Sequence, residues 1–347
     1  MRTRTNLKSI RNKSIFSVNT ILKIMTLFII TIVTISCDSD EPEPTNTEPD
    51  GVALEQRFKD NRANAKQTFT MDAVNGGTIT GTQGTKVTFP ANAFGLNGSP
   101  VTGNVDVELI EIYDRASMLL NNMPTSGIKP TGEEAALKSA GEFFINAKQN
   151  GSDLDLLLMA EVSSKGVGQG FPETMNIFRA GDNETDLDLW QEADEDGDNI
   201  TDVGGMGERE NPDAPNGWEF FYLFDISDFG WTNLDRWFNY TGALTQIYID
   251  VPDIFNGTNC EVYLIYDGEP TALARMDIYD AQTGMFTEHY GQIPVGQEIH
   301  VILVAEINGV LHSTIQGTTV VDGHIEVMTS PQPTTQAALN TAINALP

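Results

Sequence analysis

The sequence contains little cysteine and histidine, and it lacks the local motifs of the common enzyme families. Only two of its 347 residues are cysteine, Cys37 and Cys260, and four are histidine. It has no G-x-S-x-G elbow, Walker loop, G-x-G-x-x-G turn, H-E-x-x-H pair or Cys–His nucleophile pattern. The absence of these motifs does not exclude a glycosidase, because the two catalytic carboxylates of a glycosidase have no strong local motif. We therefore predict no catalytic residue and favour a non-catalytic role.

Positive charge is also scarce. The chain has 20 lysines and arginines against 49 aspartates and glutamates. Six of the bases and none of the acids precede Cys37, so the remaining chain has 14 bases and a net charge near −35. Such a surface repels nucleic acid, which excludes nucleic-acid binding, and it attracts cations.

No apolar run is long enough for a comfortable membrane span. The run IMTLFIITIVTIS at 24–36 has thirteen uncharged residues, whereas a span needs about 20. A basic start followed by a short apolar run is typical of a secretory signal, so we predict a signal peptide over residues 1–36. The alternative, an anchor helix that stays in place, is less favoured because charged and proline-rich sequence follows at once.

The end of this run, TISC at 34–37, resembles the lipobox of bacterial lipoproteins, with Thr34 where leucine is usual. The acids of DSDE at 38–41 resemble a surface-export signal of Bacteroidota lipoproteins. The resemblance implies cleavage before Cys37 and a lipid on its thiol, which anchors the protein to the membrane. It also implies an outer-membrane lipoprotein exposed at the cell surface, with a periplasm-facing orientation as the alternative. Cys260 is then alone, so no intrachain disulfide forms.

The part of the chain directly after the leader differs from its middle. Residues 38–50, DSDEPEPTNTEPD, contain no apolar residue besides proline and predict a disordered acidic tether. Residues 52–66 contain good helix formers, with Leu54 and Phe58 at helical spacing, which predicts a short helix.

Strand patterns dominate the middle of the chain. Residues 104–114 (NVDVELIEIYD) alternate as a strand, and 141–158 indicate a hairpin around the Asn150-Gly151 turn. Further strand-like runs lie at 245–251, 260–266, 271–279, 285–290, 298–307, 310–320 and 324–328. We therefore predict a mainly β protein with two antiparallel β-sandwich-like domains, a signal and lipid-anchor leader, and short terminal helices. The predicted order is a signal peptide (1–36), the lipidated cysteine, tether and short helix (37–66), β-sandwich domain 1 (67–180), an acidic insert (181–217), an aromatic junction with β-sandwich domain 2 (218–330), and a C-terminal tail or short helix (331–347).

Part of the first β region resembles a known domain. The residues GGTIT, GTKVTFPANAF and VDVELIEIYD, within 76–114, are similar to the β-sandwich domain of zonula occludens proteins, netrin receptors and ankyrins. Some members of that family cleave themselves at a His-Phe-Ser triplet, which is absent here. The resemblance therefore implies a role in binding or structure without self-cleavage.

The acidic insert contains a calcium-loop pattern, DEDGDNITD at 194–202. Carboxylates at alternate positions of a curled loop converge on a hard cation. Asn199 stands where glycine usually makes the turn, and asparagine tolerates the left-handed conformation. The glutamate expected at position 12 is missing, since Gly205 stands there. We predict a calcium ion that clips the insert, with a solvated acidic loop as the alternative; the expected ligands are Asp194, Asp196, Asp198, the carbonyl of Ile200, and Asp202.

The segment 218–240 contains ten of the 29 aromatic residues. Its central part, FGWTNLDRWF, resembles a segment of Bacteroidota surface lipoproteins of unassigned function. The favoured interpretation is a core between domains, in which Asp235 and Arg236 cap or pair, because clustered aromatics are usually buried. The alternative is a sugar site made by Trp231, Asp235, Arg236 and Trp237.

These features predict a lipid-anchored envelope protein that acts in binding or scaffolding at the outer membrane. Loops at the ends of a rigid sandwich would recognise a protein or glycan ligand. Two alternatives remain open. One is a carbohydrate-binding lipoprotein that supports glycan uptake, and the other is a hydrolase that uses two carboxylates about 5–9 Å apart.

Overall fold

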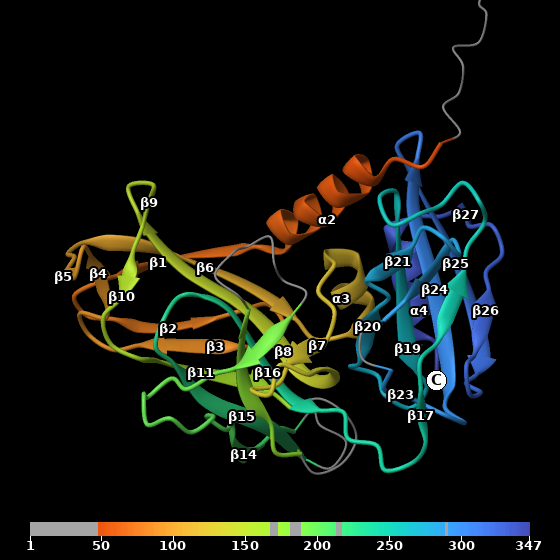
Figure 1. Ribbon diagram of the computed structural model, residues 1–347. Helices are drawn as coiled ribbons and strands as arrows, with labels where there is room; N and C mark the ends of the chain where they lie inside the picture. The colour runs from red at the N-terminus through yellow and green to blue at the C-terminus, as the bar shows by residue number, and fades with distance from the viewer. Residues whose placement is uncertain (1–47, 167–172, 181–188, 213–216, 289–290) are drawn as a thin grey trace, which may run out of the picture. The chain divides into compact units, whose positions relative to one another are not determined.

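The computed structural model describes residues 48–347 except 167–172, 181–188, 213–216 and 289–290 (Figure 1). The predicted signal peptide, Cys37 and nearly all of the tether lie outside these residues. These described residues belong to one compact unit. It is mainly β, as the sequence predicts. No described helix combines the length and apolar character that crossing a membrane requires.

The first lobe packs two large sheets against each other. The eight-stranded sheet is antiparallel except for the β13–β7 pair, and β9 pairs at its side with β8. Its strands in spatial order are β1 (Gln67–Asp72), β6 (Asn104–Ile112), β8 (Glu134–Gln149), β16 (Gly230–Trp237), β12 (Asn176–Ala180), β13 (Trp190–Glu192) and β7 (Ser126–Ile128), with β9 (Ser152–Asp153). The five-stranded sheet contains β14 (Gly205–Glu210), β15 (Trp218–Ile226), β11 (Ala160–Lys165), β3 (Lys86–Phe89) and β2 (Gly77–Thr80). A small sheet of β10 (Asp155–Leu156), β4 (Phe94–Leu96) and β5 (Ser99–Pro100) closes one end.

The second lobe has a sandwich of its own. A five-stranded sheet contains β20 (Leu273–Arg275), β19 (Cys260–Tyr266), β24 (Glu298–Ile307), β25 (Val310–Thr319) and β27 (Gln332–Pro333). Opposite lie β21 (Ile278–Asp280), β22 (Met285–Thr287), β18 (Tyr248–Asp250) and β26 (Ile325–Val327), with the pair β17 (Leu244–Thr245) and β23 (Ile293–Pro294). The side chains between these sheets form a separate apolar core that includes Val262, Leu264, Val301 and Leu303.

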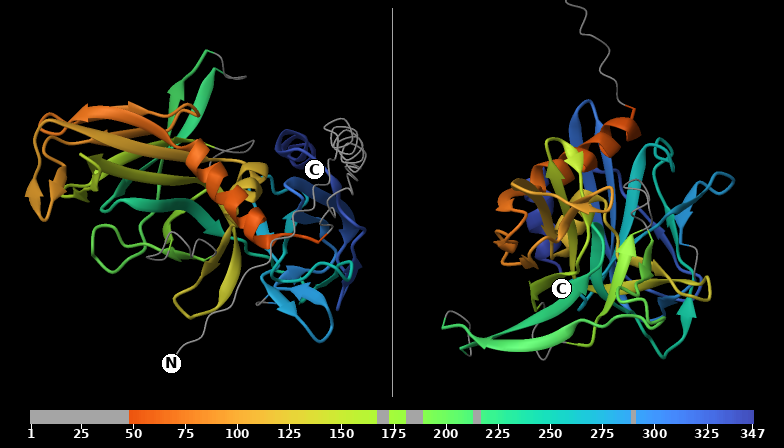
Figure 2. Two further views of the ribbon diagram at one scale, coloured as in Figure 1. Left: turned by 90° about the horizontal axis from the view of Figure 1, so that it is seen from above. Right: turned by 90° about the vertical axis from the view of Figure 1, so that its left-hand side faces the viewer.

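Three helices pack against the outward faces of the sheets and form a third apolar core with them (Figures 1 and 2). They are α2 (Gly51–Ala65), α3 (Arg115–Asn121) and α4 (Gln336–Asn344). Helix α2 begins where the Asp50 carboxylate accepts a hydrogen bond from the Ala53 amide at 3.0 Å, a common N-cap. Its Arg57 pairs with Glu306 of the second lobe, and Lys66, directly after it, pairs with Glu108 of the first. The helix therefore contacts both lobes.

Turn chemistry fixes two hairpins, one of them at the Asn150-Gly151 turn that the sequence predicts. Asn150 and Gly151, between β8 and β9, have φ values of 52° and 84°. Asn308 and Gly309, between β24 and β25, have 54° and 74°. Two successive residues with positive φ suit the right-handed twist of a hairpin, and Asn-Gly adopts them at little cost.

The structure differs from the sequence prediction in the region 181–237. Strands β15 and β16, expected to open the second domain, pair with β11 and β8 of the first lobe. The described part of the expected acidic insert also supplies β13 and β14 to the two large sheets. The physical reason is the burial of β16 on both of its faces, which requires packed side chains above and below the strand. Figure 2 shows β14 and β15 extending together beyond the rest of their sheet.

Candidate functional site

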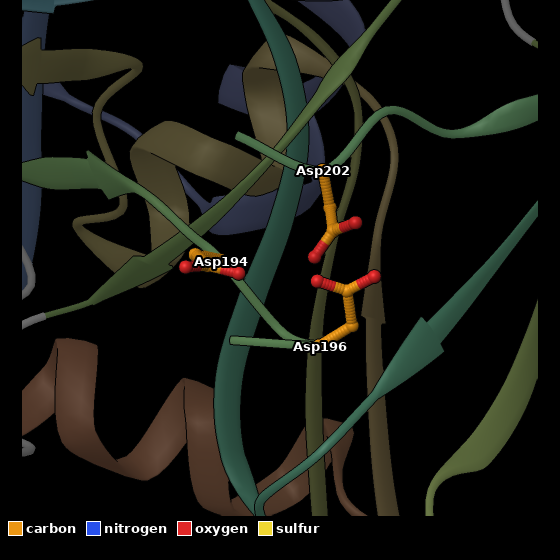
Figure 3. A group of neighbouring side chains, drawn as sticks. All are labelled: Asp194, Asp196 and Asp202. Atoms are coloured by element: carbon orange, nitrogen blue, oxygen red, sulfur yellow. The ribbon is translucent and has the colours of Figure 1, made fainter. Parts of the chain in front are cut away.

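The predicted calcium loop connects β13 and β14 and brings three carboxylates together (Figure 3). Each of Asp194, Asp196 and Asp202 offers an oxygen, and these oxygens lie within 4.8 Å of one another. In Figure 3 the carboxylates of Asp196 and Asp202 point toward each other. Asp198 is outside this group and accepts a hydrogen bond from the Ile200 amide at 2.8 Å. The side chain of Ile200 is exposed.

Backbone amides hold the loop in its curl. The Asp194 carboxylate accepts hydrogen bonds from the amides of Gly197 at 2.7 Å, Asp198 at 3.0 Å and Asn199 at 2.7 Å. Asn199 has φ 68°, the left-handed conformation predicted for this position. Oxygen ligands from carboxylates suit a hard cation such as Ca²⁺, and a cation would offset the repulsion among the three charges. Asp194, Asp196 and Asp202 are therefore the residues that could hold a metal.

A buried ion pair fixes the loop to the sheet. Arg179 of β12 donates two hydrogen bonds to Glu195, at 2.6 and 2.9 Å, and Ser227 donates from its amide and hydroxyl. Burial by itself would raise the pKa of Glu195, but the hydrogen bonds and charge of Arg179, with those of Ser227, lower it. The sequence analysis missed this anchor, because residues 16 positions apart meet only once the strands pair.

The four residues of the alternative sugar site do not form one surface. Trp231 is 7% exposed and packs on Phe144 with ring centroids 5.4 Å apart. Trp237 packs edge-on against an aromatic ring of β12 and donates its indole N–H to a glutamate of β13. Asp235 is fully buried, whereas Arg236 pairs with Glu173. Most of the aromatic surface in this segment therefore supports packing.

Two acids are buried on the outer face of β8 and β16. Glu142 and Asp235 have no exposed surface. Asn233 donates a hydrogen bond to Asp235 at 2.7 Å and accepts one from Ser139 at 2.8 Å, whereas neither oxygen of Glu142 has a partner in the described structure. Burial raises the pKa of Asp235 well above its usual range, and burial together with the Asp235 charge does so for Glu142. Acids without access to solvent cannot protonate a bound substrate, so this pair gives no support to a hydrolase.

Two hollows meet beside the aromatic pair of Phe144 and Trp231. The larger, here called the acidic groove, has a volume of about 860 Å³ and includes Asp153, Glu192 and Asp194 in its lining. The smaller, called the α2 hollow, has about 320 Å³. Its lining consists of Ile110 and the two shared aromatic residues together with Ala63, Lys59, Arg62 and Lys66. Each shared ring is 7% exposed, so only a small part of it reaches the hollows.

Comparison with known proteins gives no family. No protein-family model matches the chain. No curated protein matches it either.

Proposed function

We propose that the chain is a lipid-anchored envelope protein that binds a ligand without catalysis on the outer face of its eight-stranded sheet. The observation that supports this most is the junction of two hollows at Phe144 and Trp231, where apolar edges lie beside polar groups. Ligand sites combine concave apolar surface with a few placed polar groups in this way. The leader and the lipobox-like TISC support an anchor on Cys37 at the outer membrane.

A carbohydrate is the ligand class that the acidic groove favours. Carboxylates and amides such as Asp153, Asn146 and Gln191 line it together with the aromatic edges. Planar polar groups of this kind accept and donate hydrogen bonds to hydroxyls, and aromatic carbon contacts the apolar side of a sugar ring. For this reason, the second candidate function is a role in glycan uptake, which the sequence leaves open.

Calcium has a structural role in this proposal. Asp194 belongs to the carboxylate group and also lines the acidic groove. A cation held by Asp194, Asp196 and Asp202 would fix that wall of the groove. We expect an affinity typical of extracellular modules, with a dissociation constant of about 10⁻⁴–10⁻³ M.

Titration of the full-length protein in detergent with a panel of neutral and acidic oligosaccharides tests the proposal. Binding near Trp231 should change the tryptophan emission. The response should fall in Trp231→Phe and persist in Trp218→Phe, since Trp218 lies in the exposed part of β15, away from both hollows. An emission that no saccharide changes, or a response that Trp231→Phe retains in full, would contradict binding at this face.

A further inference from the structure

Positive charge is concentrated in the α2 hollow of a strongly acidic protein. Three of the 14 lysines and arginines that follow the leader, Lys59, Arg62 and Lys66, line this one hollow of about 320 Å³. Lys59 and Arg62 are three residues apart in α2, and Lys66 follows four residues later, directly after the helix. This spacing places them on one side of the helix, toward Ile110 and the aromatic pair. By contrast, charged residues of the neighbouring acidic groove are mainly carboxylates.

We infer that the α2 hollow binds the carboxylate of an acidic sugar unit, such as a uronic acid. The inference rests on the proposed function and names the ligand of one part of the same site. The three cations would contact the carboxylate, and the apolar edges of Ile110, Phe144 and Trp231 would contact the ring carbons. A volume at the lower end of the range for ligand pockets, about 300–1,000 Å³, suits one small unit better than a long chain.

The present partners of the cations are replaceable. Lys59 pairs with Glu55 at 3.3 Å, and both side chains are about half exposed. Lys66 pairs with Glu108 at 3.1 Å and its amine lies 5.4 Å from the centre of the Phe144 ring. The Lys59–Glu55 pair is exposed, and exposed ion pairs contribute only about 0–1 kcal/mol each. The Lys66–Glu108 pair is more buried, and Arg62 donates a hydrogen bond to the main-chain carbonyl of Asn121. A ligand carboxylate that enters the hollow can therefore replace Glu55 at little cost and share Arg62 and Lys66 with their present partners.

Two electrostatic effects oppose the binding of an anion in the α2 hollow. The C-terminal end of α2 has a partial negative charge of about half a unit, which opposes an anion. Glu55 and Glu108 offset part of the charge of Lys59 and Lys66, but direct hydrogen bonds from the three cations to a ligand carboxylate would outweigh the helix end. The strongly negative remainder of the protein repels anions at long range, so binding should be fast only when salt screens that repulsion, while the short contacts in the hollow determine selectivity.

The shape of the α2 hollow favours a small anionic ligand over a membrane surface. The Phe144 and Trp231 rings form the floor beneath the cations and are almost covered. A sugar unit can enter and touch this floor, whereas the broad headgroup surface of a bilayer would contact only the outermost charge, Lys59, whose side chain is 50% exposed.

The test compares three small probes on the full-length protein in detergent: glucuronate, glucose and cyclohexanecarboxylate. Tryptophan fluorescence and calorimetry report binding. Glucuronate should bind at least about tenfold more tightly than either of the others, because only it combines the charge with the hydroxyls. Its affinity should fall about threefold in Lys59→Gln and about tenfold in Lys59→Glu. The matched control Lys86→Glu, at an exposed position of β3 outside both hollows, should have no such effect.

Each other outcome overturns the inference in a distinct way. Equal binding of glucuronate and glucose, unaffected by Lys59→Glu, removes the charge preference but leaves the proposed carbohydrate binding intact. Equal binding of cyclohexanecarboxylate and glucuronate shows an anion site without sugar preference. Adsorption to vesicles with anionic lipid that depends on Lys59, without glucuronate binding, shows a membrane contact instead. If no probe and no member of the oligosaccharide panel binds, the proposed function fails together with the inference.

Discussion

The two faces of the eight-stranded sheet differ, although the same strands supply both. The inner face of β8 and β16 contributes Phe143, Ile145 and Leu234 to the apolar core between the two large sheets. The outer face of these strands contains the Phe144–Trp231 pair, and next to it the buried acid Glu142. The inner face of these two strands thus contributes mainly packing, whereas their outer face combines packing with buried acids and two hollows. Binding sites arise where packing is incomplete and polar groups are placed among apolar ones.

The largest expected effect tests the inner face. Phe143→Ala removes a fully buried ring that contacts Tyr113 and Phe224. We expect the free energy of unfolding to fall by about 3–5 kcal/mol, since the cavity cannot collapse between two sheets. Denaturant unfolding measures this. A loss below about 1 kcal/mol would show that the inner face is not the main source of stability.

Trp231→Ala should also destabilise the protein, by about 3 kcal/mol, because the ring belongs to the core between the sheets and the helices. In contrast to Phe143→Ala, it should enlarge both hollows and abolish the saccharide response. Thermal unfolding of both variants, each followed by saccharide titration below its midpoint, separates the two effects. A fully stable Trp231→Ala protein would make this residue part of an open binding surface rather than of the core.

The buried acid of the outer face predicts a pH dependence. The pKa of Glu142 is raised in the folded state, so the folded protein binds more protons than the unfolded chain above pH about 4.3. The contribution of Glu142 to the stability of the wild type therefore declines as the pH rises from about 4 toward the folded pKa. Glu142→Gln removes this contribution and leaves that of Asp235, whose pKa is also raised. The advantage of the variant over the wild type should therefore grow by up to about 1.4 kcal/mol per pH unit in that window.

Denaturant unfolding at several pH values between 4 and 8 measures this difference, with Glu161→Gln as the control. Glu161 is an exposed position of β11 on the same lobe. Parallel stability curves for the wild type and Glu142→Gln would show that Glu142 is charged at little cost in the folded protein.

Calcium should have the smallest effect. At millimolar calcium, an affinity of about 10⁻⁴–10⁻³ M raises the free energy of unfolding by about 1 kcal/mol. Calorimetry with calcium and with chelator should show this increase in the wild type and not in Asp196→Asn. Asp198→Asn should keep it, since Asp198 lies outside the carboxylate group. Loss of the increase in Asp198→Asn would favour the ligand set that spacing alone predicts, and equal melting of the wild type under both conditions would exclude calcium.

The sequence predicts local structure here better than it predicts partners. Strands β19 and β24 begin and end where their apolar runs do, and α2 lies within one residue of the expected helix. Helix α4 lies within the C-terminal tail or short helix expected at 331–347. These elements depend on neighbours in the chain. The placement of β16 in the first lobe depends on which distant strand it pairs with. Its own pattern, in which Thr232, Asn233 and Asp235 are buried, does not specify that strand.

The difference between local patterns and the pairing of distant strands also explains which features of the site could be predicted from the sequence. The curl of the loop at Asp194 and Asn199 follows from local spacing, and the structure shows it. The burial of Asp235 and Glu142 does not, since residues 93 positions apart share one face only in this register. The α2 hollow likewise requires the helix to lie against β6, β8 and β16, which no pattern within the helix specifies.

We propose that the protein is lipid-anchored and presents its binding face outside the cell. Protease shaving of intact cells, with a C-terminal epitope to detect the protein, tests this proposal. We predict loss of the epitope without lysis in the wild type, and loss of membrane attachment in Cys37→Ser. An epitope protected until the outer membrane is broken would contradict surface exposure, and a processed Cys37→Ser protein that still partitions with the membrane would contradict the lipid anchor.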